Sequence, residues 1–203
     1  GKNFKNFGKA QDHKRVLEGD QGKNTGGMGA YSPSRLINKD LETKIINKII
    51  KPTLKGLNEL NTEYRGFLYT GLMIVDNEPY LIEYNVRMGD PECQTIIPKL
   101  KTDLVDILLA CCEGKLNETK IEWLNKKSLC IVLCSNGYPE NFKKNIEIEN
   151  LNQILSDKDE FIFHAGTEKK NDKIYAVGGR VLNFVALSDD FKKAKEVIVN
   201  NIK

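Results

Sequence analysis

The chain has 203 residues, of which 29% are charged, and its formal net charge is only +3. Because its lysines are scattered rather than clustered, we expect neither a nucleic-acid partner nor a membrane partner. No stretch approaches the roughly 18 apolar residues of a membrane helix, and no secretory signal opens the sequence. We therefore expect a soluble, cytoplasmic protein that is long enough to form two small domains.

The cysteines argue against a zinc site or a disulfide framework. Their number is odd, they lack CxxC spacing, and only His13 and His164 are available to join them. Four of them fall in apolar stretches, which predicts buried, reduced thiols and a reducing compartment. The five are Cys93, Cys111, Cys112, Cys130 and Cys134.

Residues 19–31 form a glycine-rich loop, with five glycines in thirteen residues. Such a backbone can adopt positive φ angles and bring N–H groups close to an anion. A plain flexible connection explains the same composition, since neither P-loop nor Rossmann spacing is present. Both interpretations stay open from the residues alone.

The next stretches predict a helix and a hairpin. Apolar residues recur at helical spacing over 40–57, with Pro52 expected to kink or break the helix. Two apolar strands, 66–75 and 80–86, flank a turn-like Asp-Asn-Glu-Pro sequence. We predict that the second strand carries the chemistry of the chain.

Alternation along this second strand places residues 80, 82, 84 and 86 on an apolar face and residues 81, 83, 85 and 87 on the other. Glu83 and Asn85 are then about 7 Å apart along the strand. Their oxygens suit Mg²⁺, and Arg87 has the planar fork that binds phosphate. A solvated face of an antiparallel sheet is the alternative.

Residues 89–92 read as a tight turn into a short helix over 91–100. We predict Asp90 as its N-cap and Pro91 at its first helical position, which would create an anion-friendly corner. A second helix over 103–112 is expected to end at Gly114. The charged stretch 113–127 then suggests a boundary between domains 1–114 and 115–203, the second being mostly β with one covering helix.

Five motifs, read together, resemble the phosphoribosylamine–glycine ligases of the ATP-grasp superfamily. They span residues 11–15, 24–33, 66–69, 87–94 and 164–167. The resemblance implies an α+β fold, in which the C-terminal half of an ATP-grasp domain, an antiparallel sheet with helices, precedes a small β-rich C-terminal domain. It also implies that an N-terminal substrate domain and the nucleotide-clasping half belong to a longer protein, so that this portion would be inactive alone.

The activity that the resemblance implies is ATP-dependent ligation of glycine to 5-phosphoribosylamine. Glycyl phosphate forms first, and the products are glycinamide ribonucleotide, ADP and phosphate, in de novo purine biosynthesis. The implied cofactors are ATP and Mg²⁺ (or Mn²⁺), and the full-length form is expected to be a monomer. Alternatives are another ATP-grasp carboxylate–amine ligase and a non-catalytic anion-binding remnant.

Site residues follow from the same resemblance. Glu83 and Asn85 match the family's metal ligands, in agreement with the face argument, and Arg87 is assigned to the transferred phosphoryl group and to ATP. The other catalytic candidates are Asp90 and Glu92, for a substrate amine, and Lys14, near the acyl phosphate. Gly26 and Gly27 are candidates for binding the nucleotide phosphates, and for Gly178-Gly179-Arg180 phosphate binding and a simple β-bulge stay open. No acidic residue in the preceding strand offers a ligand for a second metal.

Overall fold

The computed structural model describes residues 3–154 and 157–202, and contacts divide the chain into two units. One, which we call the hairpin unit, comprises Gly1–Lys9, Ser34–Gly89 and Leu100–Leu124. The other, the sheet unit, comprises Ala10–Pro33, Asp90–Lys99 and Asn125–Lys203. The units interleave along the sequence, whereas the domains 1–114 and 115–203 are contiguous stretches and stay a prediction.

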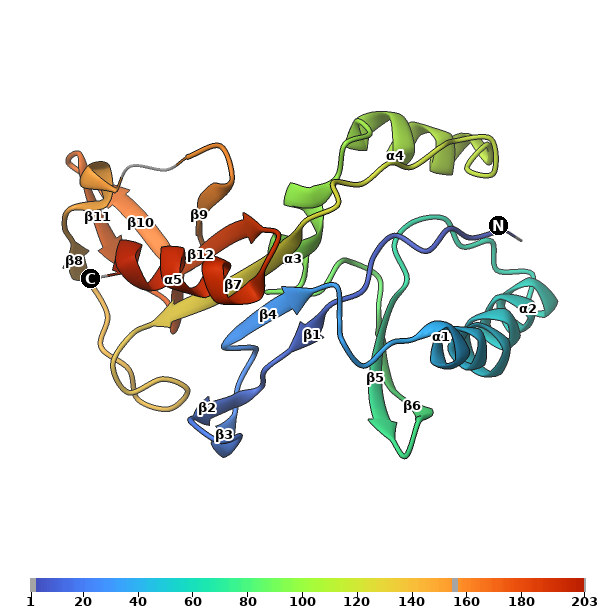
Figure 1. The fold of residues 1–203 in the computed structure, drawn as a ribbon, viewed down its shortest axis with the longest axis horizontal. Helices are drawn as coiled ribbons and strands as arrows, with labels where there is room; N and C mark the ends of the chain where they lie inside the picture. Colours follow the sequence, from blue (N-terminus) through green and yellow to red (C-terminus); the bar gives the residue numbers. More distant parts are fainter. Residues whose placement is uncertain (1–2, 155–156, 203) are drawn as a thin grey trace. The chain divides into compact units, whose positions relative to one another are not determined.

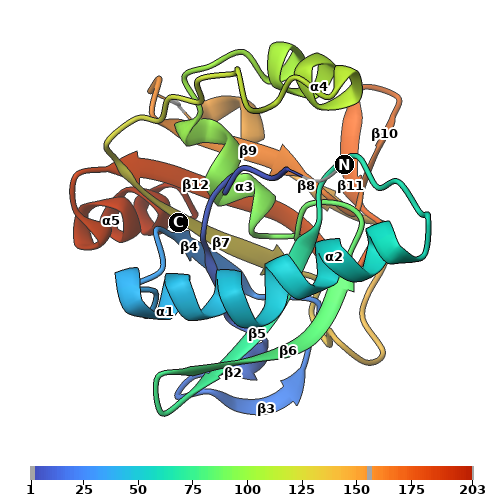
Figure 2. The same cartoon turned by 90° about the vertical axis from the view of Figure 1, so that its right-hand side faces the viewer.

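In the hairpin unit, one long helical segment packs against a β-hairpin (Figures 1 and 2). The Asn38 side chain caps the segment by accepting a hydrogen bond from the Leu41 N–H at 2.9 Å. The predicted helix is confirmed, but it does not break at Pro52. The π-turn just before Pro52 is wider than an α-turn and accommodates a residue that has no N–H donor. Its parts are α1 (Lys39–Ile45), η1 (Ile46–Ile50) and α2 (Lys51–Glu59).

The hairpin consists of β5 (Tyr69–Val75) and β6 (Glu78–Asn85). Asp76 and Asn77, both with positive φ, form the two-residue turn that suits the twist of paired strands. Register shifts by one residue, because Gly71 pairs with Glu83 while Leu72 pairs with Leu81, so that β6 carries a bulge.

The last helix of the hairpin unit is α4 (Leu104–Glu113). Asp103 caps its start by accepting from the Val105 N–H at 2.7 Å, and Gly114 ends it with φ 76°, as predicted. Of its side chains only Ile107 is buried; the expected burial of Cys112 is wrong, because this thiol lies on an exposed face.

A five-stranded antiparallel sheet with the order β1-β4-β7-β12-β9 forms the core of the sheet unit (Figure 1). One face carries Leu182, Phe184 and Ala186, which pack with Ala194 and Ile198 of the covering helix α5 (Phe191–Ile202). The strands are β1 (Gln11–Asp12), β4 (Gly29–Ser32), β7 (Lys127–Cys134), β9 (Glu160–His164) and β12 (Arg180–Ser188).

The opposite face of this sheet carries Cys130, Val132 and Val185. The short helix α3 (Cys93–Ile96) and the 3-10 turn η2 (Ile97–Lys99) cover it, since α3 contacts β4, β7 and β12 (Figure 2). With both faces covered, β12 is buried from Val181 to Leu187. The predicted burial of Cys130 is confirmed.

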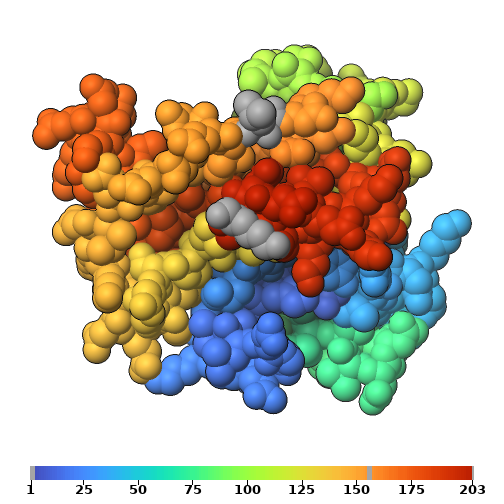
Figure 3. Space-filling view, turned by 60° about the vertical axis from the view of Figure 1, so that its left-hand side comes forward, coloured from blue at the N-terminus to red at the C-terminus, as the bar shows by residue number. Residues whose placement is uncertain are grey.

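The remaining elements of the sheet unit are two small sheets and a single turn. At the surface, α5 (red) and the β2–β3 hairpin (blue) are both visible in Figure 3. Among the residues described, no helix is both long enough and apolar enough to cross a bilayer. These elements are β2 (Arg15–Leu17), β3 (Gln21–Asn24), β8 (Ile146–Ile148), η3 (Leu151–Gln153), β10 (Thr167–Lys170) and β11 (Lys173–Ala176).

Candidate active-site residues

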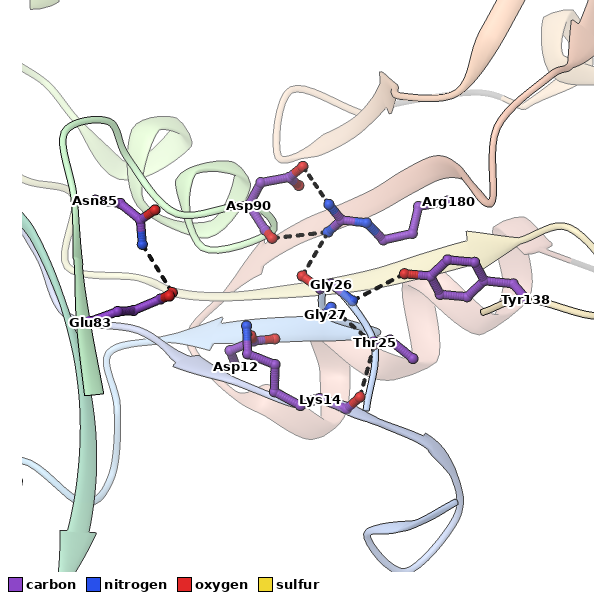
Figure 4. A network of polar contacts seen from close by, with 10 residues as sticks. All are labelled: Asp12, Lys14, Thr25, Gly26, Gly27, Glu83, Asn85, Asp90, Tyr138 and Arg180. Carbon is purple, nitrogen blue, oxygen red and sulfur yellow. Dashed lines mark hydrogen bonds and ion pairs between the residues drawn. The ribbon is translucent and has the colours of Figure 1, made fainter. Parts of the chain in front are cut away.

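Glu83 and Asn85 lie side by side near the end of β6. Asn85 Nδ2 donates to Glu83 Oε1 at 3.0 Å (Figure 4). Across the hairpin they pair with Gly71 and Tyr69, and a Cβ on residue 71 would lie 3.1 Å from Glu83 Cγ. The absence of a side chain at Gly71 therefore leaves room for the carboxylate.

The bulge corrects the predicted face of the strand. Paired residues of an antiparallel hairpin point to the same side, so the register places Tyr80 with Glu83 and Asn85, and Leu81 with Tyr84. The Tyr84 face is directed to the helical segment, where Tyr84 Oη and Thr53 Oγ1 share a hydrogen bond of 2.5 Å. Simple alternation fails because Ile82 is an additional residue in β6.

The pair on β6 fits a hard divalent cation. A carboxylate and an amide oxygen are ligands that Mg²⁺ accepts, and this ion completes its shell with water and phosphate oxygens. Among the described residues, no group of three or more His, Cys, Asp or Glu could hold a metal. A cage of three or more such side chains is thus absent from residues 3–154 and 157–202, whereas a two-ligand site remains chemically suitable.

Arg87 follows the strand and is exposed. β6 ends at Asn85, and Arg87 Nη1 donates to the Met88 carbonyl at 2.9 Å. Four of the five guanidinium donors make no hydrogen bond to a described residue, so the side chain retains capacity for an anionic ligand. Its predicted role in phosphoryl binding stays a prediction.

In the sheet unit, Asp90 is not the helix cap that we predicted. The helix α3 begins at Cys93, and the position before it, Glu92, makes no side-chain capping bond. The Asp90 carboxylate instead accepts from Arg180 Nη2 at 2.8 Å (Figure 4). Its other oxygen accepts from Gln94 Nε2 at 2.8 Å. Glu92 is 3% exposed and belongs to the buried layer beside α3.

The two glycines proposed for phosphate binding already use their amide groups. Gly26 N–H donates to Tyr138 Oη at 3.1 Å, and Gly27 N–H donates to Thr25 Oγ1 at 3.0 Å (Figure 4). Gly27 has φ 119°, and a Cβ there would lie 2.4 Å from Pro91 Cδ. The structure therefore gives this loop a packed conformation, and phosphate binding by Gly26 and Gly27 stays a prediction.

Asp12 is a partly buried acid to which the sequence reasoning assigned no role. It pairs with Ala30, which pairs with Cys130, so its side chain shares the face of the sheet that α3 covers. The carboxylate is 10% exposed, and its Oδ2 lies 2.6 Å from Lys14 Nζ. This ion pair directs the half-exposed Lys14 toward Asp12. The sequence did not reveal the position of Asp12, because β1 has only two residues and its register cannot be predicted from a pattern.

Burial also shifts the pKa values of two cysteines and a lysine in the sheet unit. It raises the pKa of the Cys130 thiol to about 12 and that of Cys134 to about 11. Burial lowers the pKa of Lys99, whose Nζ donates to Ser32 Oγ at 3.2 Å. Both cysteines are therefore neutral thiols near neutral pH and unsuited to act as nucleophiles.

Known proteins match the chain along nearly its whole length. Residues 1–93 match the family model described as phosphoribosylglycinamide synthetase, ATP-grasp (A) domain, and residues 128–203 match the C domain of the same synthetase. A relative from Caldanaerobacter subterraneus, named phosphoribosylamine–glycine ligase, is 43% identical over all of this chain and 48% of its own length. Another of that name from Vigna unguiculata is 46% identical over 91% of this chain and 61% of its own.

Solved structures agree with these matches. The crystal structure of phosphoribosylamine–glycine ligase from Thermotoga maritima superposes with a TM-score of 0.81 at 34% identity, covering 95% of this chain and 47% of that one. A biotin carboxylase domain of a thermophilic 2-oxoglutarate carboxylase reaches 0.62 at 12% identity, over 96% of this chain and 41% of its own, which shows the fold alone.

The match of residues 1–93 to an ATP-grasp domain places the chain in the ATP-grasp superfamily, and the expected α+β class is confirmed. Within that superfamily, the chain belongs to the phosphoribosylamine–glycine ligase family, also called phosphoribosylglycinamide synthetase. It spans about half the length of the curated relatives that it matches.

Proposed function

We propose that this chain is part of an ATP-dependent ligase that joins glycine to 5-phosphoribosylamine. In the first step the glycine carboxylate attacks the γ-phosphorus of ATP, forming glycyl phosphate and releasing ADP. In the second step the amine attacks the acyl carbon, and phosphate leaves with the C–O bond electrons. The observation that carries the proposal is the Glu83–Asn85 pair on β6, inside the stretch that matches the ATP-grasp domain.

The residues of the hairpin unit supply the phosphate-handling half of this chemistry. Glu83 and Asn85 would hold Mg²⁺ or Mn²⁺, which when bound neutralises charge on the ATP phosphates. Arg87, exposed and positively charged, would bind the transferred phosphoryl group. Because phosphoryl transfer depends mainly on positioning and charge stabilisation, few protein groups are needed.

The sheet unit would handle the substrate amine and the acyl phosphate. Asp90, 45% exposed, lies in the turn that we assign to the amino-bearing substrate, and the ammonium of Lys14 is assigned to the acyl phosphate. Glu92 is buried, and we assign it to supporting the turn that contains Asp90. Gly26 and Gly27 would shape the loop beside this turn.

The partners of the proposed enzyme are small molecules: ATP, glycine and 5-phosphoribosylamine. We propose that the full-length form acts as a monomer in the cytoplasm, without a nucleic-acid or membrane partner. The small net charge and the absence of a clustered basic stretch support the lack of a nucleic-acid or membrane partner.

The test is phosphate release by a full-length ligase that contains this sequence. ATP turnover should require glycine and 5-phosphoribosylamine together, and product should carry both. Parallel reactions with other carboxylate and amine pairs provide the control. Faster turnover with a different pair would overturn the substrate assignment, and no ATP turnover with any pair would favour a non-catalytic binding protein.

A further inference from the structure

Arg180 connects three segments of the sheet unit that are distant in sequence. From β12, its Nη1 donates to the Asp90 carbonyl at 2.9 Å and to the Gly26 carbonyl at 3.1 Å, while Nη2 donates to Asp90 Oδ2 at 2.8 Å (Figure 4). Its side chain is 22% exposed. One guanidinium thus fixes the glycine loop and the Asp90 turn to the central sheet.

The direction of this side chain follows from an irregularity at the start of β12. Arg180 pairs with Cys134 while Leu182 pairs with Leu133, so β12 carries one additional residue. A bulge of this kind re-aims the side chain beside it. Of the two alternatives for the Gly-Gly-Arg sequence, the geometry therefore fits the bulge, and the arginine binds acceptors of the protein itself.

The glycine before Arg180 has a specific packing role. A Cβ on Gly179 would lie 2.3 Å from Tyr138 Cδ2, so only glycine lets this ring pack here. Tyr138 Oη in turn accepts from the Gly26 N–H at 3.1 Å. Gly26 is therefore held on its carbonyl side by Arg180 and on its amide side by Tyr138.

The arrangement needs a guanidinium rather than a general positive charge. Its planar fork presents several donors in fixed directions and can serve two carbonyls and a carboxylate simultaneously. Gln94 holds the second carboxylate oxygen of Asp90 at 2.8 Å. An ammonium on a lysine stem is a compact donor that cannot span the three acceptors.

We propose that Arg180 is a positioning residue of the ligase site, which locks the Gly26 loop to the Asp90 turn and thereby sets the affinity for an amino-bearing substrate. The substrate part of this proposal rests on the proposed function. The lock itself rests only on the contacts within the sheet unit, so two experiments separate them.

The first experiment measures amide hydrogen exchange by NMR in the 203-residue chain. In Arg180→Met, and to a smaller degree in Arg180→Lys, protection of the Gly26 amide should fall by about tenfold or more. The Val132 amide, which donates to the Met28 carbonyl, reports whether the sheet remains intact and should keep its protection. Unchanged protection at Gly26 in both variants would overturn the lock.

Arg65→Met is the matched control. Like Arg180, Arg65 donates to a carboxylate, that of Glu63, and to a main-chain carbonyl, that of Cys112, but it lies in the hairpin unit. Its loss should leave the Gly26 amide as protected as in the wild type. An equal effect of Arg65→Met would overturn the specific role of Arg180.

The second experiment measures kinetics in a full-length ligase that contains this sequence. Arg180→Lys should raise the KM of glycine or of 5-phosphoribosylamine by about tenfold, with the KM of ATP changed less than about twofold. A merely structural role would lower kcat through the active fraction and leave all three KM values unchanged, which would overturn the positioning role. Absence of ligation by the wild type would overturn the proposed function instead, and the exchange experiment would still decide the lock.

Discussion

Asn85 donates its amide hydrogen to the carboxylate of Glu83 at 3.0 Å, two residues apart on one side of β6. The contact is fixed by the hairpin, because Asn85 pairs with Tyr69 and Glu83 with Gly71 beyond the bulge. The bulge also places Tyr80 on this side, so the metal-binding candidates share an exposed face with an aromatic ring. The position of the pair is thus set by strand register and by the small residue opposite Glu83.

Glu83→Gln should lower kcat/KM of a full-length ligase containing this sequence by about 100-fold or more. The substitution removes the negative charge that we propose binds the divalent cation, while it preserves the shape of the side chain. Steady-state phosphate release measures this loss, and Mn²⁺ titration measures the weakened binding. Glu78→Gln is the control, since Glu78 occupies the same strand but pairs with Lys44 at 2.9 Å and Lys48 at 2.5 Å. Near-normal turnover by Glu83→Gln would remove Glu83 from the metal role.

Gly27→Ala should destabilise the chain by about 2 kcal/mol or more. Its φ of 119° is unfavourable for a residue with a side chain, and the new Cβ would lie 2.4 Å from Pro91 Cδ and 2.8 Å from Asp12 Oδ1. Gly56→Ala is the contrasting variant, because Gly56 lies inside α2, where an added Cβ would meet no atom within 4 Å apart from its chain neighbours and the backbone of its own helix. Alanine is favoured over glycine in a helix by about 1 kcal/mol. Urea denaturation of both variants should show opposite signs; equal shifts would contradict the packing argument.

The features set by local sequence were predictable. The helix over 40–57, the stop at Gly114 and the hairpin strands follow from periodicity, glycine conformation and β propensity, and the structure contains all of them. The pairing of Glu83 with Asn85 was also within reach, because a separation of two residues survives a bulge that precedes both.

The remaining parts of the site depend on contacts between distant segments. The bulge at Ile82 arises from pairing with β5, and the composition of β6 does not predict it. The Asp90 turn was read as a helix cap because its sequence is typical of one, but Arg180, 90 residues away, binds the carboxylate. Propensity describes what a segment prefers alone, whereas this acid is directed by a partner on another strand.

Ile107→Ala should destabilise the chain by about 3 kcal/mol, while Leu109→Ala should change stability by less than about 1 kcal/mol. Both residues are on α4, so helix propensity changes similarly, but Ile107 is 3% exposed and Leu109 is 55% exposed. Denaturant unfolding curves of the two variants measure the difference. Equal losses of unfolding free energy in the two variants would show that Leu109 is buried in solution by a contact that the structure does not contain.

The contribution of the buried Cys130 thiol to the free energy of unfolding should decrease at alkaline pH. Burial raises its pKa to about 12 from the ordinary value of 9.0, so the folded chain keeps the thiol protonated while the unfolded chain ionises it. Its contribution to stability is complete below pH 9 and is lost as the pH rises toward 12. The difference in unfolding free energy between wild type and Cys130→Ala should therefore be constant up to about pH 9 and then shrink by up to about 1.4 kcal/mol per pH unit. A difference for Cys130→Ala that stays constant over about pH 7 to 10.5 would contradict the burial of its thiol.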